Sequence, residues 1–155
     1  MSQTGKGSSV VFVIIIAVLL QFVFVKAQNA DSPNRAVVDF AEKYFKFDPD
    51  MANRLCDERK APDDVDVVEQ YIQSAKNEAL ERGFDLSYLK SCLYEIKTHT
   101  IKREKDRALI RLECKRKQSL LRTFFDPKVH RINELVEVSM ENGLWKVCGD
   151  VFDLP

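Results

Sequence analysis

The residues with the most definite chemistry in this 155-residue chain are its four cysteines, Cys56, Cys92, Cys114 and Cys148. An even number of cysteines in an exported chain predicts disulfides, and four cysteines allow two bridges in three alternative connectivities, which the sequence leaves open. Structural zinc sites use closely spaced pairs such as C-x2-C, and the chain contains no such pair. We therefore treat all four as disulfide candidates and expect no metal and no other cofactor.

A basic run begins at Lys115, Arg116 and Lys117, and further basic residues follow at Arg122 and Arg131. This run predicts a surface that contacts anionic lipid headgroups or docks on an acidic protein partner. The alternative is a solvated strand end. Because the whole chain has 24 basic and 24 acidic residues, we expect no nucleic-acid partner, for which an excess of basic charge is typical.

The sequence contains no catalytic motif. A nucleophile motif such as G-x-S-x-G does not occur. The two histidines, His99 and His130, stand among charged residues, as is typical of exposed positions. We therefore predict no catalytic residue.

The N-terminal segment predicts export. Residues 10–25 are almost entirely apolar, with Lys6 before them, Lys26 after them and a small residue, Ala27, at the expected cleavage site. This pattern is typical of a secretory signal peptide and predicts a mature chain that starts at Gln28. The alternative is an uncleaved membrane anchor, although the run is shorter than the roughly 20 residues of a spanning helix. In both cases we expect the rest of the chain in the periplasm or outside the cell.

The elements that position these residues follow from hydrophobic periodicity. After residues 1–27, the signal peptide or anchor, we expect a leader at 28–33 and a single domain at 34–155. Ser32-Pro33 is a helix start signal and Gly83 a stop signal, and the apolar spacing between them predicts helices at about 33–47, 49–55 and 65–82, with a loop at 57–64. Alternating apolar residues then predict four strands, at about 92–101, 107–115, 131–140 and 144–148.

Two finer expectations concern the strands. Alternation in the first strand places Cys92, Tyr94, Ile96 and Thr98 on one face, which belongs to the core face of a long hairpin. Asn142-Gly143 predicts a tight turn between the last two strands, since both residues tolerate positive φ angles. The segment 116–129 is expected to connect the second and third strands.

Three segments carry a resemblance to a known family: the opening helix 36–47, the alternating pair 92–101 and 107–115, and the closing Glu141-Asn-Gly-Leu-Trp-Lys-Val147. Over about 34–149, the chain resembles the nuclear-transport-factor-2-like superfamily, also grouped as cystatin-like, and in particular its small exported bacterial proteins. The resemblance implies an α+β fold in which three N-terminal helices pack on a curved four-stranded antiparallel sheet to form a cone. It also implies that two copies can form a homodimer through their sheets.

Superfamily members usually have a pocket between the helices and the concave face of the sheet. The resemblance implies a pocket for a small apolar ligand, lined here by Phe40, Tyr44, Tyr71, Tyr94, Val138 and Trp145. The alternative is that these side chains only fill the core, as regularly spaced aromatic residues usually do.

An isomerase of this superfamily would need a carboxylate base in the pocket. We expect Asp39 and Glu42 on the solvated side of their helix, and Glu95, Glu113 and Glu137 on the outer side of the strands. No base is therefore predicted. The Q-x-V-x-G loop of cysteine-protease inhibitors is also absent.

The sequence thus predicts an exported, non-catalytic binding or assembly domain that acts through its sheet face or through the basic connection at 115–131. Two alternatives stay open. One is an accessory subunit of a membrane-bound complex, anchored by residues 10–25. The other is a small-ligand-binding protein or isomerase-type enzyme that uses the pocket.

Overall fold

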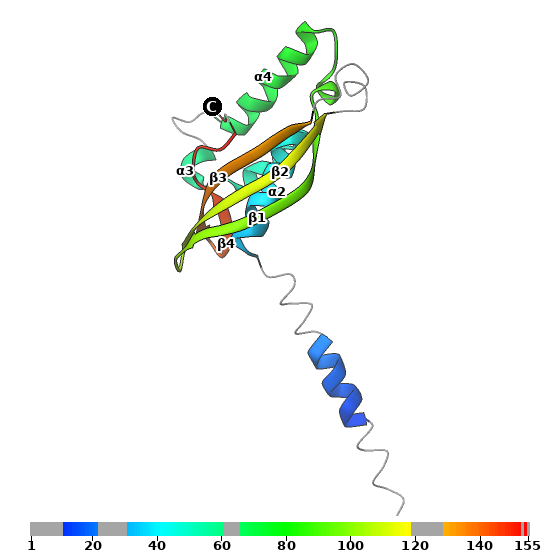
Figure 1. The fold of residues 1–155 in the computed structure, drawn as a ribbon, viewed down its shortest axis with the longest axis vertical. Coiled ribbons are helices and arrows are strands. Elements are labelled where there is room, and N and C mark those ends of the chain that lie inside the picture. Colours follow the sequence, from blue (N-terminus) through cyan, green and yellow to red (C-terminus); the bar gives the residue numbers. More distant parts are fainter. Residues whose placement is uncertain (1–10, 22–30, 61–65, 119–128, 153, 155) are drawn as a thin grey trace, which may run out of the picture. The chain divides into compact units, whose positions relative to one another are not determined.

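The computed structural model describes residues 11–21, 31–60, 66–118, 129–152 and 154 (Figure 1). The chain divides into residues 1–31 and a compact unit, Ser32–Pro155. Residues 11–21 form a helix whose side chains are all exposed. None of the described helices combines the length and the apolar character needed to cross a membrane. The sheet and the packed helices all belong to the second unit.

The first helix of the compact unit, α2 (Pro33–Lys46), forms as predicted. Ser32 caps it, because the Ser32 hydroxyl accepts a hydrogen bond of 3.2 Å from the Arg35 N–H, and Pro33 occupies the first turn. The chain leaves the helix through Phe47, whose φ of 53° is left-handed. The second predicted helix is a 3₁₀ helix, η1 (Pro49–Arg54).

The third predicted helix is α4 (Val67–Glu81), which Asp66 caps. Gly83 follows it with a φ of 76°, a conformation that glycine adopts without steric cost. Two short elements were not predicted: α3 (Asp57–Lys60), inside the expected loop, and η3 (Leu86–Tyr88). Single helical turns are too short to carry a periodic apolar signal, so periodicity cannot reveal them.

Four strands form one antiparallel sheet in the order β1-β2-β3-β4. Their bounds are Ser91–Arg103, Arg107–Gln118, His130–Glu141 and Leu144–Val147. Asn142 and Gly143, both with positive φ, form the predicted turn between β3 and β4. The α+β class with a four-stranded antiparallel sheet is therefore confirmed.

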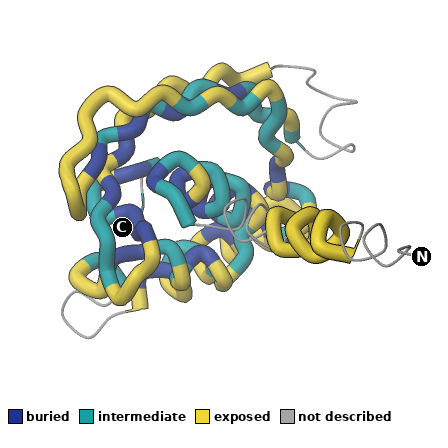
Figure 2. Tube along the Cα trace, turned by 90° about the horizontal axis from the view of Figure 1, so that it is seen from below, coloured by how far each residue is buried: buried dark blue, intermediate teal, exposed yellow. Residues whose placement is uncertain are grey.

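The main core lies between α2 and the sheet. The α2 helix contacts all four strands, and it lies across one face of the sheet in Figure 1. In Figure 2 the buried segments lie where the sheet and the helices face each other. Most of the residues with no exposed area come from α2 and from alternate positions of β2 and β3, among them Val37, Phe40, Ile110, Leu112 and Val136.

The strand β1 departs from simple alternation at Glu95, whose φ is 52°. The pairing between β1 and β2 shifts there, and the extra residue of this β-bulge exchanges the two faces of the strand. Thr98 pairs with the buried Leu112, whereas Tyr94 pairs with Lys115 on the outer face. The expectation that Tyr94 shares the core face with Thr98 is therefore wrong.

Two leucines on neighbouring strands test which face of the sheet is packed. Leu112→Ala removes a fully buried side chain and should lower the free energy of unfolding by about 2–5 kcal/mol. Leu135→Ala is the matched control, because Leu135 is 48% exposed, and it should change that free energy by less than about 0.5 kcal/mol. Urea denaturation measures both, and equal losses would contradict the packing described.

Candidate functional site

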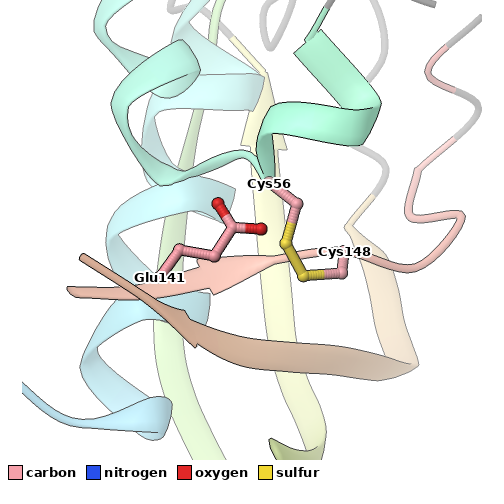
Figure 3. Close-up of side chains that lie close together, drawn as sticks. All are labelled: Cys56, Glu141 and Cys148. Carbon is pink, nitrogen blue, oxygen red and sulfur yellow. A yellow bond between two sulfur atoms is a disulfide. The ribbon is translucent and has the colours of Figure 1, made fainter. Parts of the chain in front are cut away.

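A disulfide joins Cys56, which follows η1, to Cys148, which follows β4 (Figure 3). The two Cα atoms are 5.0 Å apart, although the residues are separated by 92 positions in the sequence. The Cys56 N–H donates a hydrogen bond of 2.9 Å to the Val147 carbonyl, and Leu55 forms a parallel bridge with Val147. The disulfide thus fastens the helical segment to the short last strand.

The other two cysteines are not joined, so the expectation of two disulfides is wrong for them. Cys92 is exposed and pairs with Lys117 on the outer face, whereas Cys114 is buried on the core face. The bulge at Glu95 separates the two thiols onto opposite faces of the sheet. Burial also raises the pKa of the Cys114 thiol, which makes it a poor nucleophile.

Polar side chains of β3 surround the disulfide. The Ser139 hydroxyl lies 3.1 Å from the Cys148 sulfur and 3.7 Å from the Cys56 sulfur. One carboxylate oxygen of Glu141 lies within 4.8 Å of both sulfur atoms, and Figure 3 shows this carboxylate directed toward them. The tertiary structure therefore gathers two sulfur atoms, a hydroxyl and a carboxylate in one place.

Lys146 supplies the positive charge beside the disulfide. Its side chain is only 7% exposed, and its Nζ lies 2.9 Å from Asp57 Oδ1 and 2.9 Å from Glu141 Oε2. A buried ammonium group is costly unless it is paired, and two carboxylates meet that need here. The hydrogen bond from Lys146 holds the pKa of Asp57 below its usual range, and the same bond raises the pKa of Lys146.

A separate groove of about 720 Å³ is lined by residues of α2, α4, the adjoining ends of β2 and β3, and the C-terminal segment. Its aromatic wall is built around Tyr44, which stacks on Tyr71 with ring centroids 4.5 Å apart and contacts Phe45 and Phe152 at 5.0 and 5.1 Å. The Tyr44 hydroxyl donates a hydrogen bond to the Phe152 carbonyl. Burial raises the pKa of Tyr71, so its phenol stays protonated. We call this feature the aromatic groove.

The polar lining of the aromatic groove consists of Arg116, His130, Arg131, Asn133, Glu134 and Asp150. The Arg116 guanidinium lies 4.9 Å from the centroid of the Phe45 ring, and its Nε donates a hydrogen bond of 3.0 Å to the Ser91 hydroxyl. These contacts fix the direction of Arg116. Arg131 also lines the groove, but it pairs with Lys115 and therefore projects from the outer side of β3, where it is exposed.

The structure distributes the six predicted pocket residues over three places. Phe40, Val138 and Trp145 are buried in the core, so the space between α2 and the sheet is filled. Tyr44 and Tyr71 line the aromatic groove. Tyr94 lies on the outer face, where the Lys115 Nζ is 5.9 Å from the centroid of its ring.

The predicted surface-binding residues do not all lie on one face of the sheet. Lys115, Arg116 and Lys117 belong to β2 and not to the connection after it, so the expected start of that connection at 116 is wrong. Lys115 and Lys117 lie on the outer face, where Lys115 forms an ion pair of 2.6 Å with Glu95, whereas Arg116 lines the aromatic groove. Arg122 lies outside the described residues. Arg131 pairs with Lys115, so Lys115, Lys117 and Arg131 share the outer face of the sheet and only Arg116 is directed to the other side.

Two residues that line the aromatic groove, Glu134 and Phe152, were not identified from the sequence. Glu134 pairs with Leu112 and lies on the core-facing side of β3, yet it is exposed because the helices do not cover this end of the strand. Val136 and Val138 are alternate residues on the core face, and extending this alternation towards the N-terminus places Glu134 on the same face. Phe152 carries no local signal, because its place depends on the C-terminal segment folding back against α2.

No family model, no curated protein and no solved structure matches this chain. The resemblance described above therefore rests on the order of elements and on the closing segment 141–147. The intramolecular disulfide adds a separate indication about the environment. Disulfides persist in oxidising, exported compartments and are rare in the cytosol.

Thiol labelling tests the pairing of the cysteines. In the native protein we expect iodoacetamide to modify Cys92 alone, because it is the exposed free thiol, and to reach Cys114 only after denaturation. Cys56 and Cys148 should react only when a reductant is added as well. Peptide mass spectrometry identifies each modified residue, and labelling of Cys56 in the absence of reductant would contradict the disulfide.

The Asp57–Lys146 pair predicts a dependence of stability on pH. Because the pKa of Asp57 is lower in the folded than in the unfolded chain, its contribution is fully present above about pH 4 and is lost as the pH falls through the folded value. Asp57→Asn should therefore flatten the decline of the unfolding temperature below about pH 4.

Circular dichroism at a series of pH values measures this decline. Asp106→Asn is the control, since the Asp106 carboxylate makes no ion pair with any described residue, and it should keep the wild-type slope. Identical slopes for the wild type and Asp57→Asn would rule out a contribution from this pair.

Proposed function

We propose that this protein is an exported, non-catalytic binding domain and that the aromatic groove takes an amphipathic ligand with an anionic group. One observation carries the proposal: a stacked aromatic wall shares a groove of about 720 Å³ with the oriented guanidinium of Arg116. Ligand sites commonly have volumes of about 300–1,000 Å³, with a mainly apolar lining and a few directed polar groups. The aromatic groove has a volume in this range, and its exposed lining is more polar than is usual for such a site.

The aromatic wall would bind the apolar part of the ligand. Tyr44, Phe45, Phe47, Tyr71 and Phe152 support one another through ring contacts, so the wall is rigid before a ligand arrives. Aromatic side chains offer a large contact area and gain further from stacked or edge-to-face rings. An aromatic ring or a short aliphatic chain would therefore fit this wall.

Arg116 would bind the anionic part. The contacts of Arg116 with Phe45 and Ser91 orient its guanidinium before binding, which lowers the entropy that binding must cost. Guanidinium groups bind carboxylate, sulfate and phosphate oxygens with two parallel hydrogen bonds. Asp150 adds little opposing charge, because it already forms an ion pair of 3.1 Å with Arg59. Glu134 would accept a hydrogen bond from a hydroxyl or amine on the ligand.

Glu134 also favours a second candidate, an enzyme that transfers a proton within the aromatic groove. A carboxylate base and a protonated tyrosine, here Tyr71, are the groups that such chemistry uses. We favour simple binding because Glu134 is exposed to water and accepts no hydrogen bond from any described residue. Glu134→Gln would abolish turnover by an enzyme but would leave the binding of an anionic ligand intact.

Export is part of the proposal. The apolar run at 10–25 and the Cys56–Cys148 disulfide both support a periplasmic or extracellular site of action. The order of helices and strands supports membership in the nuclear-transport-factor-2-like group, with its cone and its pairing of sheets. Anchoring by residues 10–25 would make the same domain an accessory subunit beside a membrane, with the groove facing its partner's ligand or lipid.

Anilinonaphthalene sulfonate, an anionic aromatic dye that fluoresces in apolar sites, tests this proposal. We expect saturable binding of one dye per chain, and Arg116→Gln should weaken it about tenfold, as the loss of one charged hydrogen bond predicts. Tyr71→Ala should weaken it by a similar factor. Fluorescence titration measures both dissociation constants.

Two controls separate the aromatic groove from other surfaces. Lys117→Gln removes an equal charge from the outer face and should leave the dissociation constant unchanged. Phenylnaphthylamine, which lacks the sulfonate, should bind wild type and Arg116→Gln equally. Dye binding that is insensitive to both Arg116→Gln and Tyr71→Ala would refute the site.

A further inference from the structure

The disulfide and the carboxylate of Glu141 form a second cluster, whose sulfur and oxygen atoms are of the kinds that bind metal ions. The two cysteine sulfur atoms and one carboxylate oxygen of Glu141 all lie within 4.8 Å of one another (Figure 3). Glu141 Oε2 accepts hydrogen bonds from Lys146 and from the Asp57 N–H, whereas Oε1 accepts none from the described residues. The hydrogen bonds to Oε2 therefore fix the orientation of the carboxylate group, and Oε1 remains available to a ligand.

We infer that, when the disulfide is reduced, Cys56, Cys148 and Glu141 form a binding site for a zinc ion, with water as the fourth ligand. Zinc favours tetrahedral sites made of thiolates, imidazoles and carboxylates, with Zn–S bonds of about 2.3 Å and Zn–O bonds of about 2.0–2.2 Å. In such a site the ligand atoms lie about 3.5–3.8 Å apart. Breaking the S–S bond lets the sulfur atoms separate to that distance, and the carboxylate needs to approach by only about an ångström.

The reduction step requires a dithiol reductant. Both cysteines line a groove of about 580 Å³, but Cys148 is half-buried whereas Cys56 is buried, so the reductant thiolate attacks the Cys148 sulfur and Cys56 leaves as a thiolate. The second thiol of the reductant then releases Cys148 and closes the reductant's own disulfide. Two electrons and two protons pass to the protein. Zinc binding to the two thiols afterwards releases two protons to solvent.

The charges around the cluster fit a bound zinc ion. Two thiolates and one carboxylate carry three negative charges against two on the metal. The ammonium groups of Lys146 and Lys60 balance the remaining one and the charge of Asp57, which pairs with both. The hydrogen bond of Lys146 to Glu141 also orients the carboxylate, as outer-shell partners of metal ligands commonly do. The Ser139 hydroxyl lies close enough to donate to the Cys148 thiolate.

Sequence spacing gives no sign of this site. Cys56 and Cys148 are 92 residues apart, and only the pairing of β4 with the segment after η1 brings them together. The site would make the metal content of the protein depend on its redox environment. In an oxidising compartment the disulfide holds the two segments, and under reducing conditions zinc takes over the same role.

Cobalt replaces zinc as a spectroscopic probe in the test. The protein with Cys92→Ser, which lacks the exposed thiol, is reduced, freed of reductant under argon and titrated with Co²⁺. We expect one cobalt per chain with an intense thiolate-to-cobalt charge-transfer band, which Zn²⁺ displaces. The oxidised protein should bind none. Cys56→Ser should abolish the band, which excludes Cys114 as its source.

Glu141→Gln provides the decisive variant, because it keeps the side-chain volume and removes the anionic ligand. We expect it to weaken cobalt binding at least about tenfold. Glu137→Gln, which changes another carboxylate that lines the same groove, is the matched control and should bind as the parent does. Circular dichroism follows the fold, and a reduced chain that has unfolded should regain its native spectrum on adding Zn²⁺. The proposal fails if the reduced protein shows no band or if Glu141→Gln binds cobalt as tightly as the parent.

Discussion

Packing of α2 against one face of the sheet is the constraint on which the rest of the structure depends. Phe40 and Val37 have no exposed area and contact the same core as Leu112 and Val136, which lie on separate strands. Burial of each such side chain contributes about 1.5–3 kcal/mol, so the helix and the sheet have little stability apart from each other. Because α2 is packed against the sheet, the rings of Tyr44 and Phe45 near its C-terminus and the C-cap residue Phe47 have fixed positions.

Both candidate sites lie where this packing ends. The aromatic groove forms because the C-terminal turn of α2, the helix α4 and the C-terminal segment bring their rings together beside an end of the sheet where Glu134 and Arg131 stay uncovered. The disulfide forms where the chain that leaves η1 meets the end of β4. Helix and sheet supply most of the side chains of both sites, and the irregular segments add Phe152 to the groove and both cysteines to the disulfide.

The charged residues of the two candidate sites also differ in their surroundings. Lys146 is buried with its ammonium group between two carboxylates, an arrangement that fixes geometry and tolerates little change. Arg116 is held by a ring and a hydroxyl, an arrangement suited to an incoming anion. Successive side chains of β2 lie on opposite faces of the sheet, so its consecutive basic residues have different surroundings. Lys115 and Lys117 point away from the groove into which Arg116 points.

The sequence by itself determined the principal helices, the four strands and the turn at Asn142-Gly143, because caps, apolar periods and turn residues act over a few neighbouring positions. It also identified Tyr44, Tyr71, Arg116 and Arg131, without indicating that they line one groove. Only the tertiary structure decided the bulge at Glu95, the separation of Cys92 from Cys114 and the meeting of Cys56, Glu141 and Cys148. These features depend on strand register and on contacts between residues far apart in the chain, and neither leaves a periodic trace in the sequence.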